Sequence, residues 1–215
     1  MLFNSIEFLI FLPIVFILYW FVFRQLKLQN LFIVIASYIF YGWWNKEFLI
    51  LIATTTLLSY LSGILIDKYR ERFLQKIVSG CNIIINIAIL AYFKYCNFFG
   101  ESFAELMTSI GIKTDWITLD ILLPVGISFY TFQALSYSID VYRGKIKATR
   151  DIVAFFAYIS FFPQLVAGPI ERATNLLPQM LKERTFEYSS AVDGLRQIIW
   201  GFFKKVAIAD LLSPY

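Results

Sequence analysis

The stretch ILLPVGISFYTFQALSYSIDVYRG, residues 121–144, has the length of a membrane-spanning helix but carries a run of polar side chains. About 20 mostly apolar residues suffice to cross a bilayer. Pro124 and Gly126 indicate an irregular start, as expected for a helix that begins inside the membrane. Polar groups at such depth are costly and therefore suggest a functional role. The candidates in this stretch are Ser128, Tyr130, Gln133, Tyr137 and Asp140.

Four of these candidates share one helix face. Tyr130, Gln133, Tyr137 and Asp140 recur at steps of three, four and three residues, whereas Ser128 is out of phase with Tyr130. One interpretation is a polar seam that forms hydrogen bonds with neighbouring helices, with Asp140 paired to a basic residue at the interface. The other is that this face forms the wall of a substrate passage. The spacing alone leaves both open.

Further apolar blocks lie on both sides of this stretch, at 2–23, about 30–44, 47–66, 77–99, 152–169 and 195–212. Of the 215 residues, 59% are hydrophobic and only 16% charged. In soluble domains roughly 45–50% of the residues are apolar and about 25% are charged. This composition excludes a soluble enzyme, a nucleic-acid-binding protein and a disordered tail. Since no linker rich in Gly, Ser or Pro separates the blocks, we expect residues 1–215 to form one membrane domain, an all-α polytopic helical bundle.

The distribution of basic residues predicts the orientation of the bundle. With the amino terminus outside, the loops at 24–29, 67–76 and 143–150 face the cytoplasm and hold ten Lys or Arg residues. The outside loops near 45–46 and 100–120 hold two. Short cytoplasmic loops are enriched in Lys and Arg, so this arrangement fits the positive-inside rule.

The block at 152–169 departs from that regular alternation. It is short, and two prolines and a glycine interrupt it, so its helical hydrogen bonding cannot continue. Irregular backbone at membrane depth must be enclosed by protein or line a water-filled cavity. We therefore expect a re-entrant or broken segment that returns to the cytoplasmic side. The polar and turn residues at the end of this segment need partners elsewhere in the fold. They are Gln164, Gly168, Pro169, Glu171 and Arg172. Alternatively, this is a membrane-to-surface turn on which Glu171 and Arg172 are solvated.

The sequence contains no self-sufficient catalytic set. It has no histidine, which removes the commonest general base and metal ligand. It also shows no phosphate-binding glycine loop, nucleophile elbow, metal-ligand cluster or pair of carboxylates on one span. From the residues alone we predict no metal site and no catalytic residue in this chain.

Two long motifs resemble the membrane-bound O-acyltransferase family. These are LLPVGISFYTFQALSYSIDVYRG at 122–144 and FFPQLVAGPIER at 161–172. The similarity is strongest to its bacterial branch, which includes the alginate O-acetyltransferase membrane subunit and the D-alanyl transfer protein of teichoic acid. Shorter matches follow the family's order: LFNSIEFLIFLPIVFILYW at 2–20, SYIFYGWW at 37–44, FKYCNFF at 93–99 and GFFKKVAIAD at 201–210.

The resemblance implies an activity and a location. A multi-pass protein of the bacterial inner, or cytoplasmic, membrane would take an acyl group, acetyl in the alginate-type members, from a thioester donor on the cytoplasmic side. That donor would be acetyl-CoA or an acyl carrier protein, used as substrate, with no bound cofactor. The acceptor would be the hydroxyls of an extracytoplasmic polysaccharide, reached directly or through a partner transferase. The partners would thus be this polysaccharide, the partner transferase where one is used, and the lipid bilayer. Nucleic acid would not be a partner.

The resemblance also assigns roles within the chain. Family members are longer and carry an essential histidine in their second half, so this chain resembles the amino-terminal half of the fold, and the histidine is expected beyond Tyr215. Residues 128–140 would line or brace a substrate tunnel through Ser128, Tyr130, Gln133, Tyr137 and Asp140. The second group of candidates, from Gln164 to Arg172, would shape its cytoplasmic mouth. None of the ten is assigned a catalytic role.

Two other functional classes stay open from the sequence. A small multi-span transporter or channel could use the polar face at 130–140 as its permeation path. Against this stands the lack of paired intramembrane charges, since Asp140 and Lys94 are expected near opposite surfaces. A catalytically silent remnant of a transferase is the other alternative.

Overall fold

The computed structural model describes residues 3–69, 71–111, 121–166 and 168–212. Within these ranges all regular secondary structure is helical, which confirms the all-α prediction. Two helices are long and apolar enough to cross a membrane, α3 (Phe48–Lys68) and α4 (Arg72–Ser109). Shorter apolar helices precede them: α1 (Ile6–Ile17), which continues through the π-helical turn η1 (Leu18–Val22), and α2 (Leu26–Gly42). The length and composition of these helices are consistent with the expected helical membrane protein.

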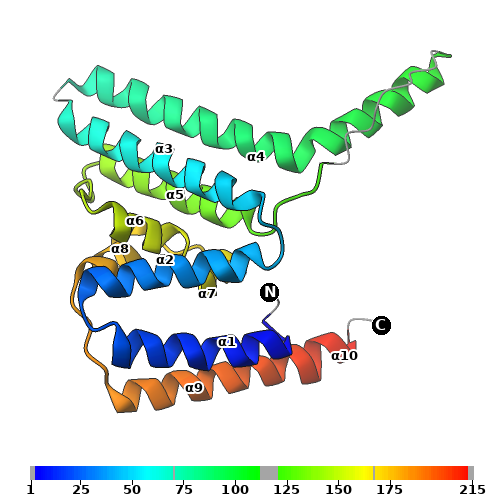
Figure 1. Ribbon diagram of the computed structural model, residues 1–215. Helices are drawn as coiled ribbons and strands as arrows, with labels where there is room; N and C mark the ends of the chain where they lie inside the picture. Colours follow the sequence, from blue (N-terminus) through cyan, green and yellow to red (C-terminus); the bar gives the residue numbers. More distant parts are fainter. Residues whose placement is uncertain (1–2, 70, 112–120, 167, 213–215) are drawn as a thin grey trace.

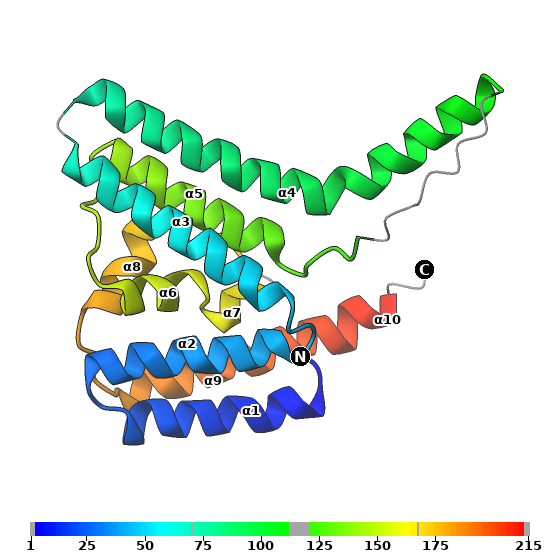
Figure 2. The ribbon, with the colours of Figure 1, turned by 45° about the horizontal axis from the view of Figure 1, so that its top comes forward.

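These helices run side by side in a flat arrangement. α5 (Ile127–Tyr142) packs between α3 and α4 on one side and the short helices of the interior on the other. At the far flank lie α1 and α9 (Tyr188–Phe202), which continues through η2 (Phe203–Ala209) into α10 (Asp210–Leu212) (Figure 1). The connections α1–α2, α3–α4 and α5–α6 share one end of the bundle, on the left in Figures 1 and 2. The three loops that the charge count assigns to the cytoplasm therefore lie together.

The interrupted block forms two short helices in the middle of the molecule, α6 (Ile152–Ile159) and α7 (Phe162–Leu165), and a third, α8 (Ala173–Leu181), follows it. The amide of Phe162 donates to Ser37 Oγ at 3.1 Å, well inside α2. The Met180 carbonyl accepts from Asn30 Nδ2 at 2.8 Å, about two turns nearer the start of α2. The chain thus advances along α2 and comes back. That this excursion enters and leaves the membrane from one side stays a prediction.

A cysteine-accessibility experiment tests that prediction. Ala173, at the start of α8, is fully buried, so the exposed Asn175 is the position for the probe. In a background with Cys81 and Cys96 replaced by serine, Asn175→Cys should react with impermeant reagents only from the cytoplasmic face. This follows because the charge pattern assigns this region to the same side as the loop at 67–76.

Two exposed lysines provide controls for this experiment. Lys76→Cys should label from the cytoplasmic face and Lys46→Cys from the opposite face. If Asn175→Cys labels together with Lys46→Cys, the segment crosses the membrane completely and the re-entrant interpretation is wrong.

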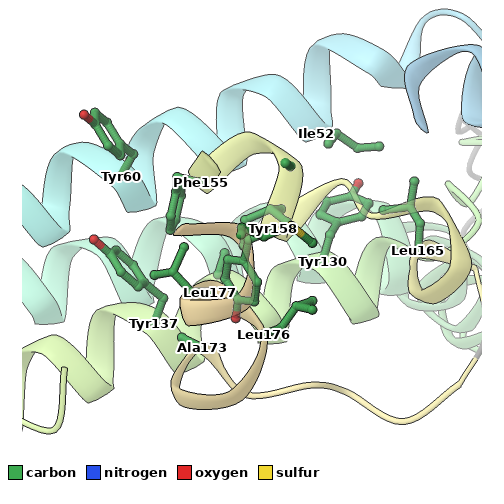
Figure 3. Packing of buried hydrophobic residues seen from close by; sticks show 14 of the residues in the cluster. Ile52, Tyr60, Tyr130, Tyr137, Phe155, Tyr158, Leu165, Ala173, Leu176 and Leu177 are labelled. Atoms are coloured by element: carbon green, nitrogen blue, oxygen red, sulfur yellow. The ribbon is translucent and has the colours of Figure 1, made fainter. Parts of the chain in front are cut away.

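Helices α3 and α5 approach closely because a glycine faces an aromatic ring. A Cβ placed on Gly63 would lie 2.5 Å from Cε1 and 2.6 Å from the hydroxyl oxygen of Tyr137. The ring cannot easily move, since it packs against Phe155 with centroids 4.5 Å apart (Figure 3). Next to it, Ser62 Oγ and Ser138 Oγ share a hydrogen bond of 3.1 Å. Small residues that allow such approach are typical of helix contacts in membranes.

Gly63→Ala should therefore loosen the contact between α3 and α5. We expect a loss of roughly 1–3 kcal/mol in the free energy of unfolding, the usual cost of overpacking a core. Thermal unfolding of the purified variant in detergent measures it. Gly80→Ala on α4 is the matched control, since nothing lies within 4 Å of its added Cβ. Equal unfolding midpoints for both variants would contradict the packing described for Tyr137.

Candidate functional site

The two sequence motifs meet where α5 begins. Gly126 adopts a positive φ of 77°, which few residues other than glycine tolerate, and it precedes the first turn of α5. A Cβ on Gly126 would collide with the carbonyl oxygen of Leu165, at the end of α7. The Tyr41 hydroxyl donates to the Val125 carbonyl at 2.8 Å and fixes this turn to α2. The irregular start of α5, expected from the sequence, is thus a three-way contact among α2, α5 and α7.

About two turns beyond Gly126, Gln133 on α5 joins the same two motifs. Its Nε2 donates to the Tyr158 carbonyl at 3.1 Å, and the Tyr158 hydroxyl donates back to the Gln133 carbonyl at 3.2 Å. Gln133 Nε2 also lies 3.5 Å from Oε1 of Gln164 on α7. Both Gln133 and Tyr158 are buried, so these bonds satisfy groups that would otherwise be costly in the interior.

The other end of the polar face is held by the loop after α5. The amide of Thr149 donates to the Tyr137 hydroxyl at 3.2 Å. Asp140 Oδ1 lies 4.0 Å from Nζ of Lys145, so the expected pairing of Asp140 with a nearby basic residue is present. The second carboxylate oxygen, Oδ2, is buried and has no hydrogen-bond partner among the described residues.

The structure brings some of the ten candidates together and leaves others apart. Tyr130, Gln133, Tyr137 and Asp140 are all buried on the inner face of α5, and Tyr130 lies near Leu165 (Figure 3). Gln164 joins them through Gln133. Ser128 is half-buried.

The rest of the second motif is less buried than this group. Gly168, Pro169 and Arg172 are exposed, and Glu171 is half-buried. Neither Glu171 nor Arg172 forms an ion pair with any described residue. The polar face of α5 is therefore a seam held by hydrogen bonds within this chain, and the assignment of a tunnel wall stays a prediction.

Sequence reasoning missed two cavities beside α7. One, of about 510 Å³, lies among α1, α2 and α8 and reaches Phe162. The other, of about 320 Å³, lies at the opposite end of α7 and is lined by Tyr41, Val125 and Val166. Phe40 lines the second cavity and Phe162 the first, and their ring centroids are 5.5 Å apart. An aromatic cluster thus separates two cavities, neither of which any of the ten candidates lines. In the sequence, the phenylalanines of the first apolar block were the feature that could have indicated this aromatic cluster.

The arrangement provides walls and hydrogen-bonding groups rather than a reactive centre. Within residues 3–69, 71–111, 121–166 and 168–212, no three His, Cys, Asp or Glu side chains gather as a metal site would require. The seam offers amide, phenol and carboxylate groups fixed by neighbouring helices. Such groups can position a substrate or brace a passage.

Comparison with known proteins identifies relatives over nearly the whole chain. It is 41% identical over 217 residues to the probable alginate O-acetylase AlgI of Pseudomonas aeruginosa, covering 99% of this chain and 41% of that protein. It is 40% identical over 217 residues to the protein of that name in Azotobacter vinelandii, covering 100% of this chain and 42% of the relative. A peptidoglycan O-acetyltransferase of Helicobacter pylori is 30% identical over 240 residues, covering 98% of this chain and 45% of the relative.

The chain spans less than half the length of these curated relatives. No family profile matches the sequence, and no solved structure matches it. The alignments nevertheless extend over nearly all of the chain, from α1 to the carboxy-terminal helices. Over the part that it covers, the chain is therefore similar to proteins named as bacterial O-acetyltransferases, which is consistent with the resemblance to the membrane-bound O-acyltransferase family.

Proposed function

We propose that this chain is the amino-terminal part of a membrane O-acetyltransferase. The complete protein would take an acetyl group from acetyl-CoA or an acyl carrier protein on the cytoplasmic side. It would deliver that group, directly or through a partner transferase, to hydroxyls of an extracytoplasmic polysaccharide. The observation that carries this proposal is the 40–41% identity, over nearly the whole chain, with proteins named alginate O-acetylases.

The reaction defines what this chain supplies and what it leaves to the rest of the protein. An oxygen of the acceptor, or of an intermediate carrier, bonds to the acetyl carbon as the carbon–sulfur bond breaks, and the thiol departs with the proton. A base must receive that proton from the hydroxyl. With no histidine in these 215 residues, we assign the base to a residue beyond Tyr215. The seam on α5 then has a positioning role, because it fixes α7 against α5 through Gln133 and Gln164.

The transporter alternative receives no support from the polar face. A permeation path along residues 130–140 needs side chains open to water. Gln133, Tyr137 and Asp140 are instead buried, with hydrogen bonds or an ion pair to residues of α6 and the loop after α5.

The positioning role predicts a split between activity and abundance. In the complete protein, Gln133→Leu removes the bonds from the side-chain Nε2 to the Tyr158 carbonyl and to Gln164 at similar side-chain volume. We expect polymer-bound acetate to fall by roughly ten- to a hundredfold, since small misplacements of reacting groups have effects of that size. Membrane abundance, measured by immunoblot of the same cells, should fall by much less.

Phe132→Leu is the matched control, because this neighbouring side chain is 44% exposed and points away from the seam. It should leave both acetate and abundance near the wild-type values. Asp140→Leu, at the other end of the seam, should behave as Gln133→Leu does. Parallel losses of acetate and abundance in the two seam variants would show that the seam serves folding alone.

A further inference from the structure

The cavity of about 510 Å³ has an apolar body and a basic rim. Its walls come from Leu12, Val15 and Ile33 of α1 and α2 together with Leu176 of α8. At its inner limit lies Phe162, whose ring contacts Phe11 and Phe40 at centroid distances of 5.4 and 5.5 Å. At the rim are the three consecutive charged residues of the α8–α9 connection: Lys182, Glu183 and Arg184. Its volume is in the range of cavities that hold small ligands.

Arg184 is fixed at this rim by neutral partners. Its Nη1 donates to the Tyr19 hydroxyl and its Nη2 to Asn30 Oδ1, both at 2.5 Å. Its Nε donates to the Gln179 carbonyl at 3.0 Å. Among the described residues no carboxylate lies within ion-pair distance of the guanidinium. The half-buried Arg184 is therefore held in place with its charge uncompensated.

The rest of the rim adds to this positive charge. Lys182 is exposed and has no hydrogen bond or ion pair among the described residues. Among the described residues, Glu183 is the single acidic residue that lines the cavity, so Lys182, Glu183 and Arg184 together carry a net charge of +1. The connection is anchored beside the cavity by Phe186, whose ring lies 5.5 Å from that of Trp20 in η1. This end of the bundle also holds the basic loops (Figure 2).

We propose that this cavity binds one anionic phospholipid of the cytoplasmic leaflet, with the phosphate between Lys182 and Arg184 and an acyl chain along α1 toward Phe162. Basic pockets between transmembrane helices on the cytoplasmic side commonly bind anionic headgroups. The combination of a long apolar wall with cations only at its rim matches an amphiphile whose charge lies at one end. A soluble anion would leave the apolar walls unmatched.

A lipid titration of the complete protein tests this site. The protein is purified in detergent, stripped of lipid, and titrated with phosphatidylglycerol or with phosphatidylcholine of the same acyl chains. Thermal unfolding midpoints report stabilisation, and native mass spectrometry counts retained lipids. We expect one phosphatidylglycerol to bind, at least about tenfold more tightly than phosphatidylcholine, since each basic residue near a headgroup contributes to such selectivity.

Two variants separate the headgroup contact from the acyl-chain contact. Lys182→Glu should remove the preference for phosphatidylglycerol, and its matched control is Lys76→Glu, an exposed lysine at the same end that lies outside the cavity. Leu12→Trp, which fills the cavity while leaving the rim unchanged, should weaken binding of both lipids.

Three results would overturn the proposal. They are equal binding of the two lipids by the wild-type protein, an unchanged preference in Lys182→Glu, and retention of lipid by Leu12→Trp. Displacement of phosphatidylglycerol by CoA at equal concentration would assign the cavity to the thioester donor instead. Because the readout is binding, a failure here leaves the proposed transferase activity unaffected, and a failure of that activity leaves this result standing.

Discussion

Expressed on its own, the 215-residue chain is expected to transfer no acetyl group to any polysaccharide. The physical reason is that the sequence lacks histidine, the commonest general base, and the proposed base lies beyond Tyr215. The measurement is ester-linked acetate released by mild alkali from the extracellular polymer of cells that lack the chromosomal gene. We expect the level of the empty-vector strain, which is a complete loss relative to the intact gene.

Abundance of the short chain in the membrane must be measured in the same cells. The Gln133→Leu form of the complete protein supplies a useful comparison, because it retains the catalytic residue and loses only the seam. Acetate above the empty-vector level, from membranes that hold only residues 1–215, would contradict the assignment of the catalytic residue beyond Tyr215.

Substituting Gly126 should destabilise the protein more than substituting Gly63 does. Gly126→Ala places a Cβ at a positive φ and against the Leu165 carbonyl, which is backbone and cannot rotate away. The positive φ costs on the order of 1 kcal/mol, and forced displacement of α7 adds about 1–3 kcal/mol. We expect a lower unfolding midpoint in detergent and a reduced yield of folded protein.

Gly144→Ala isolates the contact from the backbone strain. Gly144 has a φ of 71°, close to the 77° of Gly126, but nothing lies within 4 Å of its added Cβ. Gly144→Ala should therefore lower the free energy of unfolding only by the cost of the positive φ. If the two variants unfold at the same temperature, the close approach of α5 and α7 at Gly126 is not as described.

Local features of the fold were predictable from the sequence because they depend on spacing. Steps of three and four residues place Gln133 and Tyr137 on one face of α5, and the structure buries that face. Pro124 and Gly126 predicted the irregular start of α5, which is a turn with a positive φ. Charge counting grouped the loops that lie together at one end of the bundle (Figure 1).

Contacts between distant segments could not be predicted, because periodicity contains no information on which faces meet. Asn30 and Met180 are 150 positions apart and form a buried hydrogen bond at 2.8 Å. The apolar side of α8 packs on α6 inside the molecule, and nothing in the spacing of either segment indicates that the two helices meet. Residues 100–109, which the charge count included in the outside loop at 100–120, instead continue α4 to Ser109, and Figure 2 shows the bend in this helix. The cavity at Arg184 depends on the same long-range packing.

The decisive measurement for the proposed activity is the acetate content of the cell's extracytoplasmic polysaccharide with and without this gene. We predict that deletion removes ester-linked acetate, that the complete reading frame restores it, and that a frame ending at codon 215 does not. Polysaccharide from the deletion strain with an unchanged acetate content would refute the proposed function, because a membrane O-acetyltransferase of this kind must leave its product on a polymer.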